Sequence, residues 1–292
     1  MKRYFTWIVL LVYAGATVAQ QINPQFDHIT TSDGLSNADI TSIFQDSRGC
    51  MWLGTEDGLN KYDGYNITVY EPAPDDTTCL SGGIIWEIME QANGELWLAT
   101  NGGINIYNPL TDKFRVLEVL QNGQYQNFKQ GCRALCRLDT ARLLIGTTEG
   151  LWLYNKETQQ AKPYIIEDEE IVIRDLRLDK NNKLWACSEG NGLYIYDIKT
   201  GTIRQFVHEE TDTSSINNNN LRCSYQDKTG NIWVGTDAGL NLFLPEKGIF
   251  RRFGYKPGKQ HGPPQGHAHV IHEDAKGRLW MAFQHGLALY DH

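Results

Sequence analysis

The stretch that decides the fold is WLGTEDGLNKYD, from Trp52 to Asp63, because close variants of it return five more times. The later copies begin at Trp97, Leu144, Trp185, Trp233 and Trp280. The steps between successive first residues are 45, 47, 41, 48 and 47 residues. Repeats of this period, each containing several short strands, are typical of β-propellers, whose blades must stack because one blade cannot bury its own hydrophobic face.

Each part of the repeat predicts one part of a blade. MWLGT indicates a short strand, and EDG indicates a tight turn in which Gly58 takes a positive φ at little cost. LNKYD is the returning strand, while ITSIFQ before it and NITVYEP after it supply a first and a fourth strand. Four antiparallel strands make one propeller blade. We interpret the recurring Trp as a wedge between blades, since a residue present in nearly every repeat serves the repeat itself.

The first twenty residues differ from the rest of the chain. Lys2 and Arg3 precede an apolar run, and the small residues Thr17 and Ala19 follow it, which predicts a signal peptide over residues 1–19. An uncleaved anchor is the alternative. We expect residues 20–292 to form one exported, periplasmic propeller domain with no membrane span in the mature chain.

The charge excludes some classes of partner. The formal net charge is −8, and removal of Lys2 and Arg3 with the signal peptide takes it to −8 − 2 = −10. An acidic domain is poorly suited to nucleic acid or to anionic membrane surfaces, so neither is expected as a partner.

The cysteines do not form a recognisable disulfide framework. All six stand at different positions of the repeat. Cys132 and Cys136 are four residues apart on an expected strand, about 13 Å along it, which is too far for a bond between them. Other pairings stay open at this point, as do free buried thiols.

Two of the repeats carry a recognisable pattern. The run GLSNADITSIFQDSRGCMWLGTEDGLNKYD at residues 34–63 resembles the two-component regulator propeller repeat, and LRCSYQDKTGNIWVGTDAGLNLF at residues 221–243 resembles it well. In that family the propellers form the periplasmic sensor of hybrid two-component histidine kinases. Typical members carry two seven-bladed propellers, a β-sandwich, a membrane span, a kinase and a response regulator.

This chain departs from the family pattern in size. It has six repeats and lacks room for a kinase, so the resemblance implies a ligand-sensing module that is not itself an enzyme. A fragment of a longer hybrid histidine kinase, a degenerate gene and a free-standing binding protein all stay open. The implied protein partners are a companion sensor or kinase chain, or a second copy in a homodimer.

The two ends of the repeat array suggest how the ring closes. The last repeat stops after its third strand, whereas residues 26–31 resemble a displaced fourth strand. We therefore predict an all-β propeller of six four-stranded blades, with residues 26–31 paired to residues 286–290. The alternative is an incomplete seven-bladed ring with an open gap.

Differences between the repeats indicate a binding site. When the first strands are aligned, their second positions are Thr41, Trp86, Arg133, Arg174, Arg222 and His269. First strands lie nearest the propeller axis, so these side chains are candidate ligand contacts at the channel. Arginines suit carboxylate or sulfate and Trp suits a sugar face, which predicts an oligosaccharide ligand carrying acidic groups. On this reading Arg174→Ala, at the centre of the run, costs at least tenfold in affinity.

Three other interpretations compete with this one. The arginines could simply pair with nearby acids such as Asp175 or Asp227. The chain could be a glycan-active enzyme, sialidase-like or lyase-like, although no catalytic residues, cofactor or metal site stand out. It could also be a protein-interaction scaffold, for which propellers are well suited.

Overall fold

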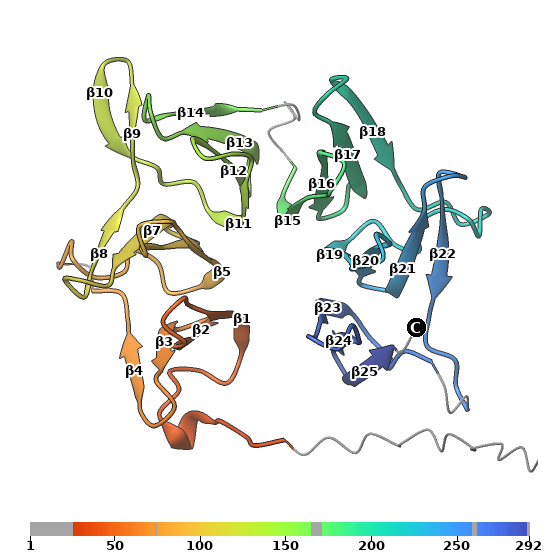
Figure 1. Cartoon of the computed structure of the whole chain (residues 1–292), viewed down its shortest axis with the longest axis horizontal. Helices are drawn as coiled ribbons and strands as arrows, with labels where there is room; N and C mark the ends of the chain where they lie inside the picture. The colour runs from red at the N-terminus through yellow and green to blue at the C-terminus, as the bar shows by residue number, and fades with distance from the viewer. Residues whose placement is uncertain (1–25, 74, 165–170, 259–261, 291–292) are drawn as a thin grey trace, which may run out of the picture.

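The chain folds as a β-propeller. The computed structural model describes residues 26–73, 75–164, 171–258 and 262–290. Six antiparallel sheets surround a common centre, and the first strand of each sheet lies innermost (Figure 1). The predicted all-β, six-bladed architecture is confirmed, while the predicted signal peptide lies outside the described residues. The described part contains no helix long and apolar enough to span a membrane.

The blades follow each other along the chain. The first three consist of β1 (Ile40–Gln45), β2 (Met51–Thr55), β3 (Gly58–Tyr62), β4 (Ile67–Tyr70); β5 (Ile85–Glu90), β6 (Leu96–Thr100), β7 (Gly103–Asn108), β8 (Lys113–Val116); and β11 (Cys132–Arg137), β12 (Arg142–Thr147), β13 (Gly150–Asn155), β14 (Gln160–Pro163). The last three consist of β15 (Ile173–Leu178), β16 (Lys183–Ser188), β17 (Leu193–Asp197), β18 (Thr202–Phe206); β19 (Leu221–Gln226), β20 (Ile232–Thr236), β21 (Gly239–Leu244), β22 (Ile249–Phe253); and β23 (Ala268–Glu273), β24 (Leu279–Phe283), β25 (Gly286–Tyr290).

The tight turn of the repeat joins the second and third strands. In blade 1, Gly58 has φ +114°, the left-handed conformation predicted for it. The Thr55 hydroxyl donates a 3.0 Å hydrogen bond to the carbonyl of Gly58, and it accepts one from the amide of Asp57. The side chain of Thr55 therefore closes the turn from inside the blade.

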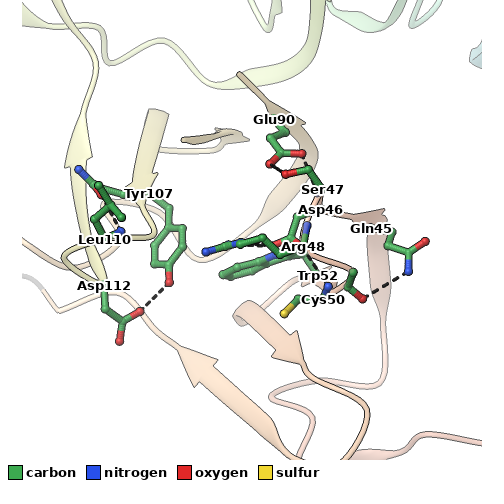
Figure 2. Close-up of polar contacts among 12 residues, drawn as sticks. Gln45, Asp46, Ser47, Arg48, Cys50, Trp52, Glu90, Tyr107, Leu110 and Asp112 are labelled. Atoms are coloured by element: carbon green, nitrogen blue, oxygen red, sulfur yellow. Dashed lines mark hydrogen bonds and ion pairs between the residues drawn. The ribbon is translucent and has the colours of Figure 1, made fainter. Parts of the chain in front are cut away.

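The recurring Trp is a wedge between blades, as predicted. Trp52 is fully buried in a cluster with Leu59 of its own blade and with Ile85, Ile88 and Leu98 of the next. Its indole Nε1 donates a 2.9 Å hydrogen bond to Asp46, which also binds Arg48 (Figure 2). The indole of Trp52 thus packs against blade 2, while its N–H group is held by Asp46 of blade 1.

The same Asp–Trp hydrogen bond recurs in three other blades. The pairs are Asp179–Trp185 at 3.1 Å, Asp227–Trp233 at 2.9 Å and Asp274–Trp280 at 3.0 Å. Blade 3 has Leu144 in place of the Trp, and blade 2 keeps Trp97 but has Gln91 in place of the Asp.

An additional hairpin stands between blades 2 and 3. Strand β9 (Glu118–Gln121) pairs with β10 (Gln124–Asn127) around Asn122 and Gly123, both with positive φ. An Asn-Gly pair favours this kind of two-residue hairpin turn. The hairpin was not predicted, although its sequence signal was present.

The predicted closure by the N-terminal strand is wrong. The sixth sheet has three strands in the described residues, and residues 26–30 form no strand. The chain instead makes a short 3-10 turn, η1 (Thr31–Asp33), followed by Gly34 at φ +110°. The Asp33 carboxylate accepts hydrogen bonds from the amide and hydroxyl of Thr30 at 2.8 and 2.9 Å. This local capping uses the backbone amide of Thr30 and turns the chain toward blade 1.

Two blade faces are exposed: the face of blade 1 that points away from blade 2, and the face of blade 6 that points away from blade 5. Ile43 in β1 is 64% exposed, whereas its counterpart Ile88 in blade 2 is 6% exposed. Leu287 in β25 is 47% exposed, whereas its counterpart Leu59 is fully buried. The inner strands pack consecutively from β1 through β5, β11, β15 and β19 to β23. Among the described residues, each of these two faces therefore lacks the neighbouring blade that the four middle blades have on both sides.

The cysteines are free thiols, all six of them. Burial raises the pKa of Cys136 to about 11 and that of Cys223 to about 12. These two thiols are therefore protonated at neutral pH and behave as small core residues.

Candidate functional site at the inner strands

The six candidate residues share one structural property. In every blade the ladder between the first two strands shifts register around the second residue of the first strand, so that this residue pairs with nothing across the ladder. A β-bulge of this kind leaves one residue unpaired and re-aims its side chain. The bulged residues are Thr41, Trp86, Arg133, Arg174, Arg222 and His269.

Trp86 and Arg133 form one unit across blades 2 and 3. The Arg133 guanidinium lies over the Trp86 ring, 4.5 Å from its centroid, in a cation–π contact. Burial lowers the pKa of Arg133, which nevertheless stays charged at neutral pH. Its Nε is buried and makes no hydrogen bond within the described part of the chain. Arg133 is thus held by a ring and lacks an acid partner there.

The other two arginines are paired with acids of their own blades. Arg174 Nε donates to Glu189 at 2.9 Å, and its Nη2 lies 2.8 Å from the same carboxylate. Arg222 Nε likewise donates to the carboxylate of Asp237. In both pairs the acid lies fifteen residues after the arginine, in the turn after the second strand. The residue fifteen after Arg133 is Thr148, which explains why Arg133 has no such partner.

The interpretation that the arginines pair with nearby acids is confirmed for Arg174 and Arg222, but the suggested partners Asp175 and Asp227 are wrong. Asp175 accepts hydrogen bonds from the amide and hydroxyl of Ser224 in the next blade, at 2.8 and 2.6 Å. Asp227 holds the indole of Trp233. The actual partners, Glu189 and Asp237, were missed because acids are common in turns. Only the pairing of the second strand with the first places these two acids beside the bulged arginines.

The two remaining candidates, Thr41 and His269, each have a different neighbour. Thr41 donates its hydroxyl to the carbonyl of Ile85, so it fastens blade 1 to blade 2. His269 lies against His267, with ring centroids 5.8 Å apart, and His267 contacts Asp237 at 3.4 Å. Burial and the nearby charge of Arg222 lower the pKa of His269, which favours the neutral ring at pH 7.

Glu87 is a further residue of this region that sequence reasoning missed. It follows Trp86 and accepts a 2.5 Å hydrogen bond from the amide of Leu135, two residues after Arg133. Burial and repulsion by Asp175 raise the pKa of Glu87 to about 8. Glu87 therefore anchors the strand that carries Arg133 and leaves its surroundings less negative than the sequence suggests.

The arrangement suits binding better than catalysis. The structure brings an aromatic face, an arginine without an acid partner and the Arg174–Glu189 pair together, since both Glu189 and Arg174 act electrostatically on Arg133. Within residues 26–290, leaving out the undescribed gaps, no three His, Cys, Asp or Glu side chains gather as a metal site.

Comparison with known proteins finds a family match for two segments of the chain. The model of the family described as two component regulator propeller matches residues 34–57 and 215–238. The curated protein "Histidine kinase P4" from Formosa agariphila is 40% identical over 77 residues, which are 26% of this chain and 6% of that protein.

Solved structures share the fold. The extracellular domain of a putative hybrid two component system from B. thetaiotaomicron matches with a TM-score of 0.74 and 24% identity, over 91% of this chain and 35% of that one. A catalytically inactive virginiamycin B lyase from Staphylococcus aureus matches with a TM-score of 0.60 and 13% identity, over 88% and 86%. At such identities the likeness shows the fold alone. Two segments of this chain thus match the two-component regulator propeller family, and the propeller fold is shared with these solved structures.

Proposed function

We propose that this propeller is an exported, periplasmic ligand-sensing module that binds an oligosaccharide carrying carboxylate or sulfate groups. It passes the signal on through a companion or continuing sensor chain and has no catalytic activity of its own. Its similarity to extracellular domains of putative hybrid two component systems supports the sensing role. The ligand class is supported by the chemistry of the bulged residues.

The observation that carries the proposal is the Trp86–Arg133 unit. Arg133 has no acid at the position that supplies the partners of Arg174 and Arg222, which makes it a local positive site in a chain of net charge −8. A planar guanidinium binds carboxylate or sulfate through paired hydrogen bonds, and a neighbouring Trp ring covers a sugar face. Arg174, whose buried Nη1 also lacks a partner among the described residues, lies beside it as a second cation.

Calorimetric titration with a panel of acidic and neutral oligosaccharides tests the proposal. Acidic members are expected to bind, with affinity that falls as salt rises. Arg133→Ala should weaken binding at least tenfold, because a hydrogen bond to a charged group contributes about 1.5–3 kcal/mol. Arg174→Ala should weaken it by a smaller factor, since Glu189 already occupies part of that guanidinium.

Arg142→Ala is the matched control. Arg142 is the first residue of β12 in blade 3 and pairs with Asp139 at the surface. Its removal should leave the affinity for oligosaccharide unchanged. Binding of neutral sugars alone, or equal effects of Arg133→Ala and Arg142→Ala, would show that the bulged arginines are structural.

A further inference from the structure

Blade 2 lacks the carboxylate that holds the Trp wedge in four other blades. Gln91 stands where those blades have Asp46, Asp179, Asp227 or Asp274. The indole Nε1 of Trp97 and the amide Nε2 of Gln91 are both buried, and neither has a hydrogen-bond partner within the described structure. Two adjacent buried donors without an acceptor carry a free-energy cost that a bound acceptor removes.

A pocket opens at this place between blades 2 and 3. Its volume is about 460 Å³, and Gln91, Trp97, Arg115, Arg137 and Lys156 are among the residues that line it. Gln91 and Trp97 are 8% and 6% exposed, so they form the floor of the pocket. The junction between blades 2 and 3, where Gln91 replaces the usual Asp, therefore has a pocket large enough to hold a small carboxylate.

The charge at the pocket is positive. The Lys156 Nζ donates to the neutral Oε1 of Gln91 at 2.7 Å and lies 5.6 Å from the Trp97 ring. Arg137 donates to the carbonyl of Glu90 at 2.9 Å, which is also a neutral partner. Arg115 is paired with Glu95, the acid on the pocket wall, at 3.1 Å.

The cations at this junction repel each other. Burial and repulsion by Arg137 lower the pKa of Lys156, and Asp139 offsets this only in part because Arg142 binds that carboxylate at 2.6 Å. An anion between Lys156 and Arg137 would relieve the repulsion as well as accept from the buried donors.

We propose that this pocket binds a small carboxylate, whose oxygens take the place of the missing Asp side chain. The carboxylate accepts hydrogen bonds from the Trp97 indole and the Gln91 amide after a small turn of the Gln91 side chain, and it pairs with Lys156. The site is separate from the bulged residues and does not depend on the function proposed for them.

The test uses acetate and malonate as probes, with sodium chloride at the same ionic strength as the reference. The thermal midpoint of the whole chain is expected to rise saturably with either carboxylate, by about 3 °C at ten times the dissociation constant. In nitrogen-15 spectra the indole N–H signal of Trp97, identified by its loss in Trp97→Phe, should shift with the same saturation curve.

Two variants make the test specific. Gln91→Asp supplies the carboxylate from within and should abolish the response to both probes, and Lys156→Met should reduce it at least fivefold. Lys61→Met is the matched control, because Lys61 lies 5.5 Å from the Trp52 ring in a blade that already has Asp46. That control should respond as the natural protein does.

The proposal is overturned if carboxylates and chloride act equally on the natural protein. It is also overturned if Gln91→Asp keeps the full response, or if the indole signal of Trp97 does not move.

Discussion

Blades 5 and 2 contain the same Trp wedge with different polar support. Trp233 and Trp97 are 1% and 6% exposed, so both are buried against the following blade. Trp233 donates to Asp227, which also accepts from the Asn231 amide at 2.8 Å, whereas the Trp97 indole has no acceptor in the described structure. The comparison indicates that apolar packing is sufficient to place the wedge, and we expect the carboxylate to add stability to a position that packing already determines.

Asp227→Ala should give the largest effect and destabilise the protein by about 3 kcal/mol. The change leaves the buried Trp233 indole and the Asn231 amide without their acceptor. Urea denaturation measures the free energy of unfolding. Asp227→Asn, which keeps an acceptor of the same shape, should lose clearly less, and a loss below about 1 kcal/mol for the Ala variant would contradict the assigned role.

A pair of Trp→Phe changes isolates the hydrogen bond. Trp233→Phe should cost about 1–2 kcal/mol more than Trp97→Phe, since both lose the same indole volume but only Trp233 loses a bond to a carboxylate. Denaturation of both variants under one set of conditions gives the difference. Equal losses would mean that the Asp227–Trp233 bond adds nothing to stability.

Gln91→Asp should convert blade 2 to the arrangement of blade 5 and stabilise the protein by about 1 kcal/mol. The new carboxylate would accept from Trp97 and pair with Lys156, which already lies 2.7 Å from the Gln91 oxygen. Gln91→Glu, one methylene longer than Asp, serves as the control and should gain less.

The gain from Gln91→Asp should depend on pH. Burial acts to raise the pKa of Asp46 and Asp227, but hydrogen bonds outweigh it and lower the pKa of both, from Trp52 and Arg48 to Asp46 and from Thr229 and Trp233 to Asp227. The same direction is expected of an Asp at position 91. A carboxyl whose folded pKa lies below its unfolded value of about 3.9 stabilises the fold above that value and loses this effect as pH falls through the folded pKa. The advantage over the natural protein should be full at pH 7 and shrink toward pH 3, and a gain that is the same at both would rule out a charged carboxylate.

The sequence predicted the features that recur in most blades. The period, the turn at Gly58 and the wedge at Trp52 follow from patterns repeated along the chain. The second residue of each first strand was predicted as a candidate ligand contact but not as a β-bulge, because a register shift depends on how this strand pairs with the second strand. The partners Glu189 and Asp237 could have been found from their constant distance of fifteen residues, which would also have marked Arg133 as unpaired.

Features that occur once were predicted poorly. Residues 26–31 resemble a fourth strand in composition, but the capping of Thr30 by Asp33 is a local contact that competes with strand pairing. The hairpin at Asn122 and Gly123 had a clear turn signal but no counterpart in other repeats to draw attention to it. A pattern seen once has no second copy to confirm it.

The bulges have a consequence for how this protein can change. A bulged residue has no cross-strand partner, so exchanging Trp86 or Arg133 for another side chain disturbs no pair in the ladder. The cores between blades are built mainly from other positions of the repeat, although Trp86 packs against one of them. A change at a bulged position therefore alters the side chain at the inner strand of a blade without altering the pairing of its first two strands.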